Sequence, residues 1–139
     1  MKHYKSEYSE VNFDENLQLL TVTWNAKTEL MDSDTFRKEL MSKIELVKHY
    51  KPRIHLIDSR EFKYIINPEE QTWVSENIFP GYAQNGVRQL AFLVSEDFIA
   101  QLSISQSVEE DKTAAFRVKY FSDIAEAKGW LLEMNAKVG

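Results

Sequence analysis

The chain alternates between two hydrophobic periodicities, which predict strands and helices in turn. Apolar residues recur at every second position in residues 17–24 and 116–121, as in strands with one buried face. Residues 53–58 and 90–94 are apolar on both faces, which favours buried strands of a parallel sheet. A weaker alternation over residues 8–13 predicts one more strand, joined to residues 17–24 as a hairpin.

Helices are predicted between and after these strands. In residues 33–50 the apolar side chains recur every three or four positions, and Pro52 follows the last of them. A second helix begins at Pro68 and is interrupted near Phe79. A third is predicted from Ser95 onward and is followed by a charged loop at residues 108–113, and the last helix follows the strand at residues 116–121.

The resulting order, β-β-α-β-α-β-α-β-α, predicts an α/β protein with a mixed central sheet and packed helices. No internal repeat, low-complexity stretch or linker interrupts the chain, so we expect residues 1–139 to form a single domain.

Composition excludes several classes of function. Seventeen basic and 22 acidic residues give a net charge of −5, which disfavours nucleic-acid binding because that binding depends on neutralising phosphates. The absence of cysteine excludes disulfides, Cys-ligated metals and thiol nucleophiles. The polar first ten residues lack the apolar stretch of a signal peptide, and no apolar run could span a membrane. We therefore expect a cytoplasmic protein.

The residues with reactive side chains form no familiar catalytic pattern. Gly81 and Gly86 have the spacing of a phosphate loop, but they follow a helix and lack the Lys and Ser/Thr that such a loop requires. The three histidines have no ligand at a familiar spacing, and His55, within a predicted strand, is expected to be packed. We expect no metal, no cofactor and no enzymatic activity. A general acid or base would have to be assembled by folding, from Asp58, Glu61 or His55.

A ligand or partner surface is expected around the second helix. Asp58 ends a predicted central strand, where ligands bind in open α/β sheets. The segment from Asn67 to Tyr82 combines a polar start with aromatic residues, which are common at interfaces, although core packing would also explain the aromatics. The expected surface consists of Asp58, Asn67, Glu69, Glu70, Trp73, Phe79 and Tyr82.

Four blocks of the sequence resemble the STAS superfamily, the fold of anti-sigma-factor antagonists, and most closely its SpoIIAA-like (STAS/SEC14) branch of small bacterial proteins. They are RIHLIDSREF at 53–62, INPEEQTWVSENIFP at 66–80, GVRQLAFLVSEDFIAQLS at 86–103 and VKYFSDIAEAKGWL at 118–131. The antagonists are switched by phosphorylation of a serine in the turn that begins the helix after the second core strand. The matching turn here, residues 66–69, has no hydroxyl, so the resemblance does not carry the phosphoserine switch over.

The resemblance implies a non-enzymatic regulatory or protein-interaction module of STAS-like type. Its SEC14-type branch suggests an alternative, a carrier of a small amphipathic or lipid-like ligand in a pocket lined by Trp73, Phe79 and Tyr82. We also expect a homodimer. The strand at residues 116–121 is predicted at a sheet edge, and the region around Phe79 adds apolar surface that one small domain would not bury.

Overall fold

The computed structural model of the chain describes residues 2–96, 98 and 116–138. In this part, six strands form one mixed sheet in the spatial order β1-β2-β3-β4-β5-β6. The strands are β1 (Lys2–Lys5), β2 (Ser9–Asp14), β3 (Leu19–Trp24), β4 (Ile54–Asp58), β5 (Gln89–Leu93) and β6 (Arg117–Phe121). The first three strands are antiparallel, and β3 to β6 are parallel. The predicted α/β class with a mixed sheet is confirmed.

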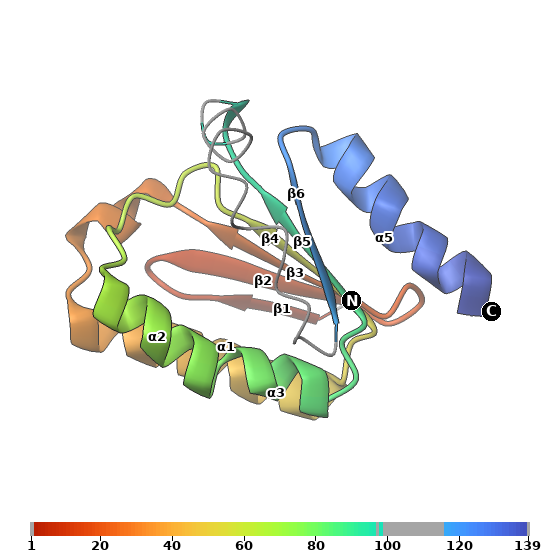
Figure 1. The fold of residues 1–139 in the computed structure, drawn as a ribbon, viewed down its shortest axis with the longest axis horizontal. Coiled ribbons are helices and arrows are strands. Elements are labelled where there is room, and N and C mark those ends of the chain that lie inside the picture. Colours follow the sequence, from red (N-terminus) through yellow and green to blue (C-terminus); the bar gives the residue numbers. More distant parts are fainter. Residues whose placement is uncertain (1, 97, 99–115, 139) are drawn as a thin grey trace.

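Helices cover both faces of this sheet (Figure 1). The helical segments are the 3₁₀ helix η1 (Ala26–Leu30) and the α-helices α1 (Ser33–Tyr50), α2 (Pro68–Asn77), α3 (Phe79–Gln84) and α5 (Ile124–Val138). Helices α1, α2 and α3 lie on one face and α5 lies on the other. Ser95 Oγ accepts a hydrogen bond from the Phe98 N–H at 3.1 Å. The rest of the helix predicted after Ser95, and the loop predicted at residues 108–113, lie outside the described residues.

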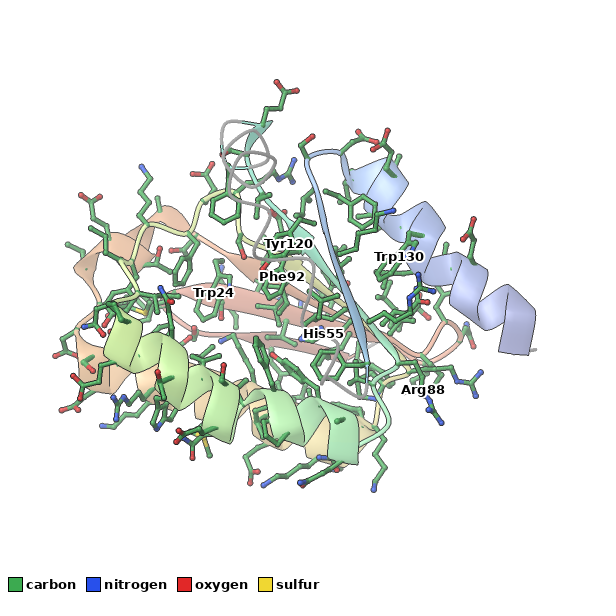
Figure 2. The ribbon with its side chains drawn as sticks, in the orientation of Figure 1. Trp24, His55, Arg88, Phe92, Tyr120 and Trp130 are labelled. Atoms are coloured by element: carbon green, nitrogen blue, oxygen red, sulfur yellow. The ribbon has the colours of Figure 1, made fainter. Side chains whose placement is uncertain are left out.

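The two apolar layers of the sheet follow from the strand alternation. Leu20, His55 and Leu90 share one register row and face α1 and α3, whereas Leu56 faces α5. All five residues of β4 are buried because this strand has parallel neighbours on both sides and helices on both faces. Figure 2 shows Trp24 and His55 on the α1 side and Trp130 between α5 and the sheet.

Local signals account for the limits of α1. The Asp32 carboxylate accepts a hydrogen bond from the Thr35 N–H at 2.8 Å and caps the first turn. The helix ends at Tyr50, since Lys51 is left-handed with φ 49° and Pro52 cannot continue the helix. The predicted range is therefore confirmed at both ends.

The prediction missed β1. Lys2–Lys5 is short and polar and carries no hydrophobic alternation, so no local pattern predicts a strand there. It is a strand because its backbone pairs with β2. The observed order thus begins with three strands rather than two. At the opposite edge of the described sheet lies β6, with Arg117 and Lys119 exposed as its alternation predicted.

Candidate interaction surface

Asp58, at the carboxyl end of β4, is held by its own turn. Its Oδ1 accepts hydrogen bonds from the Arg60 backbone N–H at 3.2 Å and from Arg60 Nε at 3.0 Å. Its Oδ2 accepts a bond from Arg60 Nη2 at 2.8 Å, and this pairing raises the pKa of the Arg60 side chain. The buried carboxylate therefore organises the loop after β4 and presents no free surface.

Glu70 is also buried, with only 2% of its surface exposed, and it joins three parts of the chain. Its Oε2 accepts a hydrogen bond from Ser33 Oγ at 3.0 Å, at the start of α1. Its Oε1 accepts one from Tyr64 Oη at 2.5 Å, in the loop before α2. Burial, followed by this bond, raises the pKa of Tyr64 to about 12. The Asn67 side chain caps α2 by accepting a bond from the Glu70 N–H at 2.9 Å.

The Ser33–Glu70 bond places the first turns of α1 and α2 side by side. Beyond these turns, partly exposed side chains of the two helices form a seam between them. One turn further on, the Arg37 guanidinium lies over the Trp73 ring, 5.0 Å from its centroid. Arg37 Nε is buried and has no hydrogen-bond partner among the described residues. Met41, one turn beyond Arg37, is exposed. We define the α1–α2 seam as Arg37, Met41, Asn67, Glu69 and Trp73.

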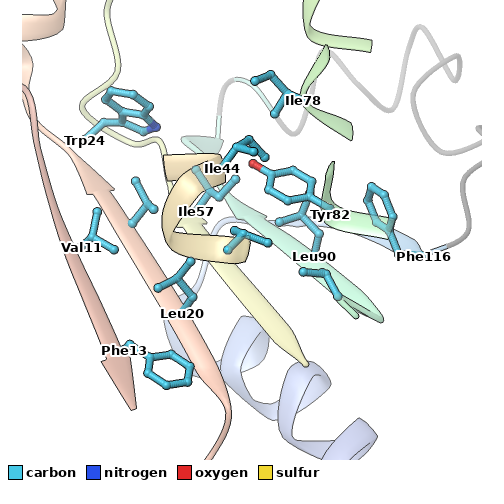
Figure 3. Packing of buried hydrophobic residues seen from close by; sticks show 13 residues of the cluster. Val11, Phe13, Leu20, Trp24, Ile44, Ile57, Ile78, Tyr82, Leu90 and Phe116 are labelled. Carbon is cyan, nitrogen blue, oxygen red and sulfur yellow. The ribbon is translucent and has the colours of Figure 1, made fainter. Parts of the chain in front are cut away.

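Tyr82 belongs to the core rather than to the expected surface. Only 4% of it is exposed, and its ring centroid lies 5.4 Å from that of His55, 5.8 Å from Phe116 and 6.1 Å from Phe79. Burial raises the pKa of its hydroxyl. Ile78 separates α2 from α3, and the Tyr82 side chain of α3 points into the cluster that Figure 3 shows. Half-buried Phe79 packs against the same cluster.

The seven residues of the expected surface thus divide by burial. Asn67 and Glu69 are exposed, and Trp73 and Phe79 are half-buried. Asp58, Glu70 and Tyr82 are buried, so their side chains are not available to a partner. Burial depends on which residues the fold brings together, and the local pattern of residues 58–82 does not contain that information.

Sequence reasoning missed two exposed apolar residues, Leu30 and Ile65, which are 76% and 86% exposed. Ile65 helps to line an open depression of about 440 Å³ together with Glu29, Lys63 and Tyr64. Leu30 follows Glu29 at the end of η1. We call Glu29, Leu30, Lys63, Tyr64 and Ile65 the apical patch. The sequence carries no signal that would have identified the two exposed apolar residues, because Ile65 stands next to half-buried Ile66 and Leu30 next to buried Met31.

The buried titratable groups outside these surfaces have structural partners. His55 Nδ1 donates to the Leu20 carbonyl at 2.8 Å, and burial lowers the pKa of this imidazole to about 4. Lys43 Nζ pairs with Glu39 Oε1 at 3.0 Å and lies 4.3 Å from the Trp24 ring centroid. Burial lowers the pKa of Lys43. The described residues contain no group of three or more His, Cys, Asp or Glu side chains that could hold a metal ion.

Comparisons with protein-family models, with curated proteins and with solved structures give no match. None of the helices in the described part of the chain is long and apolar enough to cross a membrane.

Proposed function

We propose that the protein is a non-enzymatic regulatory or protein-interaction module of STAS-like type, and that its partner docks on the α1–α2 seam. The observation that carries this proposal is the Arg37–Trp73 stack with exposed Met41 beside it. Trp, Arg and Met are enriched at protein interfaces, and Trp and Arg dominate the residues that carry binding energy.

The guanidinium of Arg37 is the group of the seam that a partner would recognise. Arg37 forms no ion pair with any described carboxylate, and its Nε is buried without a partner. A carboxylate on a partner would give the Arg37 guanidinium the ion pair that it forms with no described residue. Stacking on Trp73 already orients the guanidinium, which lowers the entropy lost on binding.

The network below the seam supports a rigid docking surface. Glu70 binds Ser33 of α1 and Tyr64 of the preceding loop, so the first turns of α1 and α2 cannot separate without breaking the partly buried Ser33–Glu70 hydrogen bond. A preformed surface of this kind suits a partner that binds without large rearrangement.

The STAS-like assignment is supported by the four sequence blocks and by the sequential order of the parallel strands. Helix α2 begins at Pro68 after the Asn67 cap, and no hydroxyl lies in residues 66–69. We therefore propose regulation without the phosphoserine switch of the antagonists. The carrier of an amphipathic ligand remains a prediction, which a bound small molecule in native mass spectrometry would support.

Affinity capture from the source cell tests the proposal with matched variants. Met41 and Ile124 are 41% and 40% exposed, on α1 and α5 respectively, and Arg37 has a basic counterpart in exposed Lys128 of α5. A partner should be captured by the native chain and by the control K128E/I124S. It should be lost, by at least tenfold, with R37E/M41S.

Circular dichroism first establishes that both variants are folded. Equal capture by R37E/M41S and by the control would remove the seam from the proposal. Failure of the native chain to capture any protein, even after cross-linking, would contradict the interaction function itself.

A further inference from the structure

We propose that the apical patch binds a second copy of this chain across a two-fold axis, with Glu29 of each copy facing Lys63 of the other. This surface is separate from the α1–α2 seam, and the inference does not depend on the proposed function. It rests on two features of the patch. One is the exposed apolar pair, Leu30 and Ile65. The other is the opposite charges of Glu29 and Lys63, which form no ion pair with a described residue.

The apolar pair is held out on a fixed part of the fold. The Lys63 N–H donates to Oγ1 of fully buried Thr28 at 2.8 Å, which attaches the loop of Ile65 to η1. Tyr64 is held from the other side by its bond to Glu70. In Figure 1, η1 and the loop before α2 lie together at the left end of the molecule. The exposed side chains of Leu30 and Ile65 therefore lie on segments that the hydrogen bonds of neighbouring residues hold in place.

The charges of the patch specify the occupant. Glu29 and Lys63 line the same depression and are both exposed, yet neither forms an ion pair with a described residue. One exposed acid and one exposed base beside an apolar pair make a self-complementary surface. A two-fold axis through the depression would bring each acid onto the base of the other copy, and both apolar pairs together.

Other occupants match the patch less well. A nucleic acid or an anionic membrane would face a chain of net charge −5, with exposed Asp32, Asp34 and Glu69 at the adjacent helix starts. A purely basic or purely acidic partner would leave one of the two charges opposite a like charge. A second copy matches both at once.

The size of the patch sets the expected strength. Five residues a side lie well below the 20–30 residues of a standard interface, so we expect a weak dimer with a dissociation constant on the order of 100 µM. Two pairs form per dimer, and reversing one charge in each copy turns both into repulsions. Each single reversal should weaken association roughly tenfold.

Sedimentation velocity between 10 and 500 µM tests the proposal with E29K and K63E. The native chain should shift toward dimer mass with concentration, and each single variant should do so only at about tenfold higher concentration. An equimolar mixture of E29K with K63E should recover association, because each base then faces an acid in the other chain. The double variant E29K/K63E should associate as the native chain does.

The apolar pair is tested with I65S, against I124S on α5 as the matched control. I65S should abolish the dimer and I124S should leave it unchanged. A native chain that stays at monomer mass up to 500 µM overturns the proposal. Association whose strength is unchanged by I65S, or by both single reversals, overturns it as well and assigns association to another surface, such as the β6 edge.

Discussion

Replacing Glu70 with alanine should destabilise the protein far more than the same change at Glu69. The two carboxylates are adjacent in the first turn of α2, but Glu69 is exposed and Glu70 is buried. E69A loses only a favourable interaction with the helix N-terminus, about 0.3–1 kcal/mol. E70A leaves the Ser33 and Tyr64 hydroxyls without their charged acceptor.

The magnitude follows from these two bonds. A hydrogen bond to a charged group contributes about 1.5–3 kcal/mol. Ser33 is exposed and can bind water instead, whereas Tyr64 is half-buried, so we expect a loss of roughly 3 kcal/mol in the free energy of unfolding. For a chain of this length such a loss lowers Tm by about 10 °C. E70Q keeps one oxygen acceptor and should fall between E70A and the native chain.

Urea unfolding followed by circular dichroism measures the three variants, with E69A as the control. A double-mutant cycle with Y64F then isolates the Tyr64–Glu70 bond. E70A should cost about 1 kcal/mol less in the Y64F background, because the hydroxyl that it would leave unbonded is already gone. Equal losses for E70A and E69A, or identical effects of E70A in both backgrounds, would refute the assigned network.

Two further predictions concern the buried histidine of β4 and two glycines of the chain. His55 titrates near pH 4 when folded and near 6.5 when unfolded, so between these values the unfolded chain binds more protons and stability falls as pH falls. Up to about 3 kcal/mol of the free energy of unfolding is therefore lost as the pH falls, and H55Q should not show this loss. Urea melts of both proteins at pH 4.5 to 7 measure it. Parallel curves of stability against pH for the two proteins would contradict the prediction. Gly86 has φ +95°, so G86A should destabilise by about 1 kcal/mol. G129A, in α5, should stabilise by about 0.5–1 kcal/mol, because outside the backbone of its own helix no described atom lies within 4 Å of the added Cβ. Thermal melts that shift in the same direction for both glycine variants would count against this reasoning.

Local sequence signals determined most of the secondary structure. Helix α1 matches its predicted range because a cap at Asp32, a periodic apolar stripe and Pro52 all act within the helix or beside it. The same holds for α2, where Asn67 and Pro68 define the start. The buried, two-sided character of β4 was visible because parallel central strands need apolar residues on both faces.

Only the tertiary structure decided which polar and apolar side chains of the loops and helix starts are exposed. Glu69 and Glu70 are indistinguishable in the sequence. Glu70 is buried because the fold brings Ser33, its hydroxyl donor, next to it from 37 residues away in the chain. Ile65 resembles a core residue, yet the loop that carries it is fixed to η1 with that side chain in water. Strand β1 exists through pairing with β2, without an apolar pattern of its own. Periodicity reports on neighbours within one turn or one strand, whereas burial and pairing depend on contacts between distant segments, which the fold alone creates.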